Sequence, residues 1–157
     1  MEYILLLRWL HILGATVLIG TGAGIAFFML MAHRTGDARH IAQTAATVVI
    51  ADWIFTATAV VAQPVTGVQL AMRIGWDLAE GWILLSLALY VLIGLCWLPV
   101  VWLQVRLKQF ALAAAERGGE LPPEYFSLFR IWFLLGIPAF VSILAILWLM
   151  VARPSFG

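Results

Sequence analysis

Cysteine and charge are the scarce components of this sequence. Cys96 is the single cysteine, so the chain can form neither an internal disulfide nor a cysteine-based metal cluster. Charged residues make up 11% of the 157 residues, and the formal net charge is +1. A charge this small, without a basic stripe or a binding motif, argues against nucleic acid as a partner.

Hydrophobic residues are abundant and decide the class of protein. They make up 64% of the chain, which leaves too little polar surface for a water-soluble domain. One helical crossing of a membrane needs about 20 apolar residues, so the chain has room for roughly four crossings and no sizeable soluble domain. We therefore expect a single all-α domain over residues 1–157, a four-helix transmembrane bundle.

The positions of the four spans follow from apolar run length and from the glycine, proline and charged residues between the runs. The expected spans are Tyr3 to Ala32, Ile41 to Met72, Trp82 to Leu103 and Phe126 to Val151. We expect the third to continue as a cytoplasmic helix to Arg117, where Gly118 and Gly119 stop it. The first run lacks a basic leader, so it is expected to remain as a membrane helix.

The basic residues predict the orientation. The first loop and the stretch after the third span carry five of them, whereas the loop between the second and third spans carries Arg73 beside two acids. The positive-inside rule then places both termini on the periplasmic side of a bacterial inner membrane.

An imidazole and a guanidinium lie inside the first apolar run. His11 occupies the middle of the stretch from Tyr3 to Gly14, and Arg8 precedes it by about one helical turn. Ionisable groups are costly in a membrane unless they are satisfied, so they indicate function. A b-type haem would satisfy both, with its iron on His11 and a propionate on Arg8. The alternatives are a buried hydrogen-bonding histidine, a proton relay or another metal role, and an Arg8 that snorkels to the headgroups.

Two other residues are candidates for the same cofactor site. Gly14 shares the helix face of His11 and makes room for a flat ring. Gln63 matches the depth of Arg8 and can bond a ligand carboxylate, or else satisfy the backbone freed by Pro64.

A second histidine ligand from the same chain is excluded by distance. His33 lies 22 residues beyond His11, about 33 Å along an ideal helix, and His40 lies at the same end. The other axial position is then a water, an open site, Met150 near the end of the last span, or a residue of a second copy. The run from Gly20 to Gly24 favours close helix packing, within the bundle or between protomers, and we expect a homodimer.

Asp52 is the one acid in the interior of a span. A structural role and a proton-transfer role both fit such a residue. By residue count it lies roughly 10 Å deeper than His11, so we do not expect the two to touch.

Several ordered motifs resemble a family of small bacterial integral membrane proteins that carries a domain-of-unknown-function label. They are Leu10-His11, Arg34 to Asp37, Ala51 to Thr56, Leu121 to Tyr125, Arg130 to Trp132 and Met150 to Pro154. The resemblance covers nearly the whole chain. It implies four helices and an inner-membrane location, and it implies no particular activity.

The first helix also resembles that of the haem-containing protoporphyrinogen oxidase of the HemJ type. Arg8 to Ile12 is similar to that family's basic-x-x-His start, and Ala32-His33 to its terminal histidine. The resemblance implies that His11 ligates haem b. The family's tryptophan followed closely by lysine is missing here, because Trp82 has no lysine nearby.

Taken together, these patterns predict a haem b protein that transfers electrons or reacts with a lipid-soluble partner such as a quinone. The alternative is a membrane assembly or transport accessory without cofactor, whose polar residues hold helices together. The haem interpretation includes a haem-dependent oxidoreductase.

Overall fold

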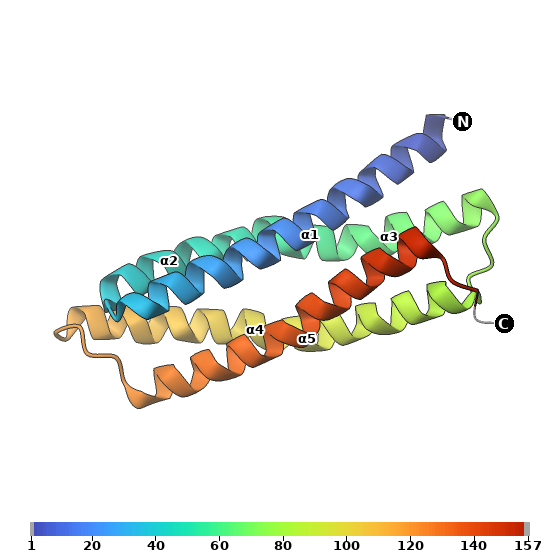
Figure 1. Cartoon of the computed structure of the whole chain (residues 1–157). Helices are drawn as coiled ribbons and strands as arrows, with labels where there is room; N and C mark the ends of the chain where they lie inside the picture. Colours follow the sequence, from blue (N-terminus) through green and yellow to red (C-terminus); the bar gives the residue numbers. More distant parts are fainter. Residues whose placement is uncertain (1, 156–157) are drawn as a thin grey trace.

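The computed structural model describes residues 2–155, and this part of the chain is helical without any strand. Its elements are α1 (Glu2–Thr35), α2 (Ala38–Ala51), the π-helical turn η1 (Asp52–Thr56), α3 (Ala57–Ile74), α4 (Gly81–Glu116) and α5 (Pro123–Ala152) (Figure 1). Since α2, η1 and α3 form one continuous segment, the described residues contain four helical segments long and apolar enough to span a membrane. The predicted all-α, four-span architecture is confirmed.

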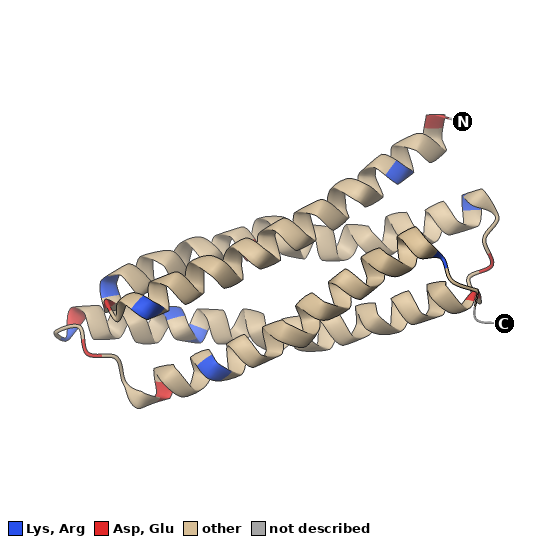
Figure 2. Cartoon of the chain, viewed as in Figure 1, with Lys and Arg blue, Asp and Glu red and all other residues tan. Residues whose placement is uncertain are grey.

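The four segments run up and down along one long axis, and the bundle therefore has two distinct ends (Figure 1). The first turn of α1, the α3–α4 loop and the last turn of α5 lie at one end, called here the terminal end. The α1–α2 turn and the α4–α5 loop lie at the other, called here the loop end. Lysine and arginine gather at the loop end, and fewer lie at the terminal end (Figure 2).

Local sequence explains where the helices begin and end. Asp37 caps α2, because its side chain accepts a hydrogen bond from the backbone N–H of Arg39 at 2.9 Å. Gly75 ends α3 in the left-handed conformation, with φ of 90°, which costs glycine little. The α4 helix continues without a break to Glu116, so the third span and its predicted extension are one helix.

Packing is tightest toward the loop end. The buried residues there include Met29, Ile41, Leu107 and Tyr125, which join α1, α2, α4 and α5 in one cluster. A smaller cluster at the terminal end is built around Trp82. Most side chains on the first turns of α1 are exposed, and these turns lean away from α4 and α5 (Figure 1). The bundle is therefore more open near the terminal end.

Pro64 lies inside α3 and removes the N–H that would bond the carbonyl of Val60. The hydroxyl of Tyr90 on α4 donates to this carbonyl. The sequence had suggested Gln63 as one way to satisfy the backbone near Pro64, but the freed carbonyl is bonded from a neighbouring helix.

The turn between α2 and α3 is a single π turn. The N–H of Ala57 bonds the carbonyl of Asp52, five residues earlier. Such turns are rare and occur often at functional sites. Asp52 and Thr56 from this turn are both buried, whereas Trp53 and Phe55 are exposed on its other side.

Candidate functional site

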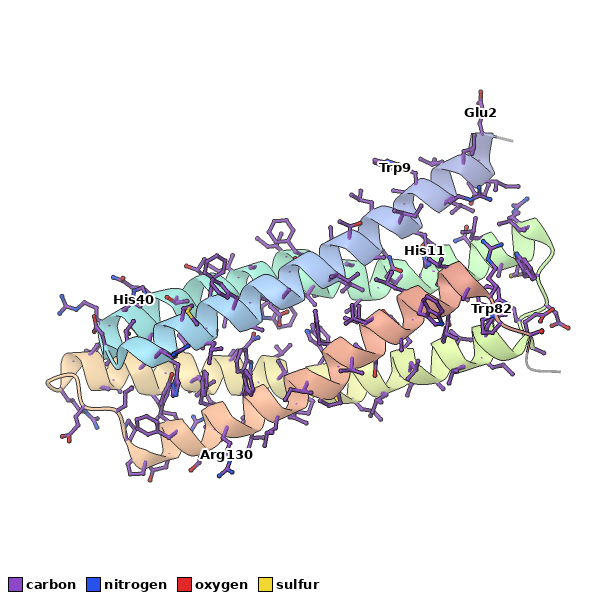
Figure 3. All side chains as sticks on the ribbon, viewed as in Figure 1. Glu2, Trp9, His11, His40, Trp82 and Arg130 are labelled. Carbon is purple, nitrogen blue, oxygen red and sulfur yellow. The ribbon has the colours of Figure 1, made fainter. Side chains whose placement is uncertain are left out.

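His11 lies at the contact between α1 and α3, in the terminal half of the bundle. Its ring points from α1 toward α3, while Trp9 points away from the bundle (Figure 3). Nδ1 of His11 lies 2.9 Å from the hydroxyl oxygen of Thr66. The imidazole is half-buried, and Thr66 is buried.

The hydrogen bonds of Thr66 assign the tautomer of His11. The Thr66 hydroxyl lies 2.7 Å from the carbonyl oxygen of Ala62, one turn earlier on α3, and 3.2 Å from that of Gln63. Because its one hydrogen is donated to these carbonyls, the oxygen accepts from the imidazole. His11 is therefore protonated on Nδ1, and Nε2 carries the lone pair that a metal requires.

A second hydrogen bond joins α3 to the backbone of α1. Nε2 of Gln63 donates to the carbonyl oxygen of His11 at 2.8 Å. This amide crosses α1 at Gly14, where a Cβ would overlap it. Gly14 therefore makes room for Gln63, whose amide nitrogen donates its hydrogen bond to the α1 backbone.

Gly67 supports the imidazole from the α3 side. A Cβ at this position would lie 3.0 Å from Cε1 of His11 and 3.5 Å from Nδ1. The ring edge therefore rests directly on the helix backbone. One turn nearer the terminal end, the Tyr3 hydroxyl donates to Oε1 of Gln69 at 2.8 Å.

A hollow lies one turn deeper than His11, between all four segments. Its volume is about 50 Å³. Its walls are apolar except at Gln63 and Tyr90, and α1 contributes Ala15, which lies one turn beyond His11 on the same helix face. This volume is far below the range for ligand sites, which is about 300 to 1,000 Å³.

The other candidate residues lie apart from this contact. Arg8 is exposed, one turn before His11 on α1. Met150 on α5 packs against the cluster around Trp82. His33 lies at the loop end, where its ring stacks on Phe129 with centroids 3.7 Å apart. The contacts described above thus bring together His11, Gly14 and Gln63.

The imidazole of His11 is chemically suited to ligate haem iron. The Nδ1 bond to Thr66 holds the ring in one orientation, as the second hydrogen bond of a ligating histidine usually does. Within residues 2–155, no three histidine, cysteine or acidic side chains are close enough to hold a metal ion between them. A haem asks for only one or two protein ligands, which suits a lone imidazole.

Sequence reasoning did not identify Thr66, Gly67 or Tyr90 as parts of this region. Thr66 could have been found, since it follows Gln63 by one turn and therefore shares its helix face. The roles of Gly67 and Tyr90 depend on how α1 and α4 pack on α3, which helix periodicity does not specify.

Comparison with known proteins gives the family. The profile described as predicted integral membrane protein (DUF2269) matches residues 5–154. The chain belongs to the DUF2269 family. No curated protein and no solved structure matches it. Membership of DUF2269 together with the four apolar segments makes this an integral membrane protein.

Proposed function

We propose that this DUF2269 protein binds haem b through Nε2 of His11 and transfers electrons to or from a lipid-soluble partner such as a quinone. The observation that carries the proposal is the hydrogen bond between Nδ1 and Thr66, which leaves Nε2 as a ligand atom. Bound there, the haem supplies one-electron chemistry. Arg8, exposed one turn away, is the cation available for a propionate.

The protein's part is to position the imidazole and to make space beside it. Thr66 and Gly67 fix the ring from α3. The existing hollow of about 50 Å³ has no room for a porphyrin, so binding requires α1 to move outward from its first turns as far as Ala15 and Leu18. Most side chains on the first turns are exposed, and the bond between Tyr3 and Gln69 would have to break in this movement. Met150 packs in a different cluster, and a water or an open position is then the simpler second axial site.

The second candidate function is that of a membrane accessory without cofactor, in which the polar residues of α1 hold helices together. The bond from Gln63 to the His11 carbonyl favours it, since it joins α1 to α3 whatever the imidazole binds. The bond between Tyr3 and Gln69 does the same nearer the terminal end.

The absorption spectrum distinguishes the two functions. The protein is purified from cells supplied with a haem precursor, and spectra are recorded with and without dithionite. The haem proposal expects a Soret band that His11→Ala abolishes and that His33→Ala and His40→Ala retain. A colourless wild-type protein that elutes as a folded species, or a band of equal intensity in His11→Ala, would reject haem ligation by His11.

We further propose a homodimer that packs through the face of α1 bearing Gly20 and Gly24. A Cβ at either glycine would meet no atom within 4 Å, so packing within the chain does not account for them. Both line a groove of about 530 Å³ between α1 and α2, whose walls also include Thr21 and Thr44. Small residues of this kind let two membrane helices approach closely.

The location that we propose is the bacterial inner membrane, with both termini in the periplasm. The support is the concentration of lysine and arginine at the loop end (Figure 2). In this orientation, His11 lies in the outer leaflet.

A further inference from the structure

Asp52 is the one buried carboxyl group in residues 2–155, with 3% of its surface exposed. It is the first residue of the π turn η1. Oδ1 accepts a hydrogen bond from the indole N–H of Trp97 on α4 at 3.3 Å, which is long for such a bond. Oδ2 is buried without a hydrogen-bond partner in the described structure.

Among the residues that the structure describes, no cation compensates this carboxyl group. The α1 helix carries no titratable residue between His11 and His33, and α5 carries none between Arg130 and Arg153. On α4 the nearest titratable side chains are Tyr90, which bonds Val60, and Cys96. The rest of α2 and α3 adds none between His40 and Arg73. A carboxylate with one long hydrogen bond is costly at this depth, so the neutral acid is favoured.

The Thr56 hydroxyl lies beside the carboxyl, at the end of the same π turn, but outside hydrogen-bonding geometry. It is also buried without a partner in the described structure. A water molecule between Thr56 and Oδ2 would satisfy both, and unpaired buried groups often mark such water.

Further unpartnered polar atoms lie toward the loop end. Both side-chain polar atoms of Gln104 on α4 are buried without a partner in the described part of the chain, and so is the indole N–H of Trp132 on α5. Gln104 follows Trp97 by seven residues, about 10 Å along the helix axis. In the terminal half, by contrast, the hydroxyls of Thr66, Ser86 and Tyr90 all donate to backbone carbonyls.

We propose that Asp52 is an internal proton-binding site that exchanges protons with the loop end of the bundle through water bound at Gln104 and Trp132. In the uptake step, a hydronium ion transfers its proton to Oδ2, which leaves a water molecule and a neutral acid. Release reverses this step, and no electron is gained or lost. The inference is independent of haem binding.

The experiment is infrared difference spectroscopy of the purified protein in lipid nanodiscs, in which acidic and alkaline buffers are exchanged over the sample. The wild type should show the carbonyl-stretch band of a protonated carboxylic acid, and this band should shift in ²H₂O. Asp52→Asn removes the carboxyl with little change in shape and should remove the band. Asp37→Asn is the matched control, because Asp37 is exposed, and it should retain the band.

The route is tested by the rate of the ²H₂O shift. Gln104→Leu should slow the shift roughly tenfold, which corresponds to about 1.4 kcal/mol in barrier height. Gln109→Leu alters an exposed glutamine on the same helix and should leave the rate unchanged. The proposal is overturned if the band survives in Asp52→Asn, if the wild-type band never shifts in ²H₂O, or if Gln104→Leu exchanges as fast as the wild type.

Discussion

The imidazole of His11 rests on Gly67, and a single added carbon at that glycine would lie 3.0 Å from Cε1. This distance is shorter than an ordinary van der Waals contact, so the ring packs too closely on the α3 backbone to leave room for a side chain at Gly67. The orientation of His11 is therefore set by two consecutive residues of α3, Thr66 through a hydrogen bond and Gly67 through its missing side chain.

Gly67→Ala should displace the ring and lengthen its bond to Thr66. We expect a smaller haem content in the purified protein and a loss of about 1 to 3 kcal/mol in stability, which is typical of overpacking. Thermal unfolding and the Soret absorbance measure the two effects. Gly94→Ala is the control, because a Cβ there meets no atom within 4 Å. Equal Soret absorbance in both variants would contradict the support assigned to Gly67.

Thr66→Val tests the orienting hydrogen bond. The valine keeps the shape of threonine but removes the acceptor for Nδ1, and loss of such a partner typically lowers metal affinity about 10-fold to 100-fold. Haem transfer to an apoprotein acceptor measures this loss, and Thr66→Ser should restore most of the affinity. If Thr66→Val retained haem as the wild type does, the bond would have no orienting role.

Gly14→Ala tests the contact between the α1 backbone and Gln63. The new methyl group would overlap the amide, so the bond to the His11 carbonyl should break. We expect a loss of about 1 to 3 kcal/mol in stability. In Gln63→Ala, which lacks the amide, the same substitution should cost much less, and a double-mutant cycle would measure the coupling. Additive losses would show that the two residues do not interact.

Gly24→Leu tests the proposed dimer. A Cβ at Gly24 meets no atom within 4 Å and Gly24 lines the groove between α1 and α2, so a leucine there should leave the protomer folded and make it monomeric. Subunit counting in nanodiscs by single-molecule photobleaching measures the change. The control is Gly136→Leu on α5, which also projects into open space and should stay dimeric. A monomeric wild type would refute the dimer directly.

Reporter fusions at the C-terminus test the orientation. We expect alkaline phosphatase to be active and green fluorescent protein to be dark, as for a periplasmic terminus. Fusion after Gly118, in the α4–α5 loop, should give the opposite pair of signals. A fluorescent C-terminal fusion would invert the proposed topology and place His11 in the inner leaflet.

The sequence predicted the number of spans because polar and charged residues are costly in lipid. They therefore interrupt the apolar runs and mark where each span ends. It also predicted that α4 would continue beyond the membrane, since Ala, Leu, Lys and Gln favour a helix up to Gly118. The sequence did not predict the π turn at Asp52. A π turn differs from an α turn by one residue, and no composition signals it.

The parts of the candidate site were only partly foreseeable. The polar residues His11 and Gln63 stood out because lipid penalises them. Their partners did not, because threonine and glycine are common in membrane helices and their roles depend on which faces meet. Gln63 shows the limit, since the sequence matched it to the depth of Arg8 and gave it a ligand carboxylate or the Pro64 backbone as a partner, whereas its amide bonds the carbonyl of His11.

The π turn has a consequence for the tolerance of this chain to deletion. One extra residue is stored between α2 and α3, and removing it would restore an ordinary α turn while leaving the faces of α2 and α3 nearly unchanged relative to each other. Thr66 and Gly67 would then still face α1. Shortening the chain by one residue at Asp52–Thr56 would thus preserve a contact several turns away, whereas deletion of one residue between Ala57 and Gln63 would rotate Thr66 by about 100° and dismantle that contact.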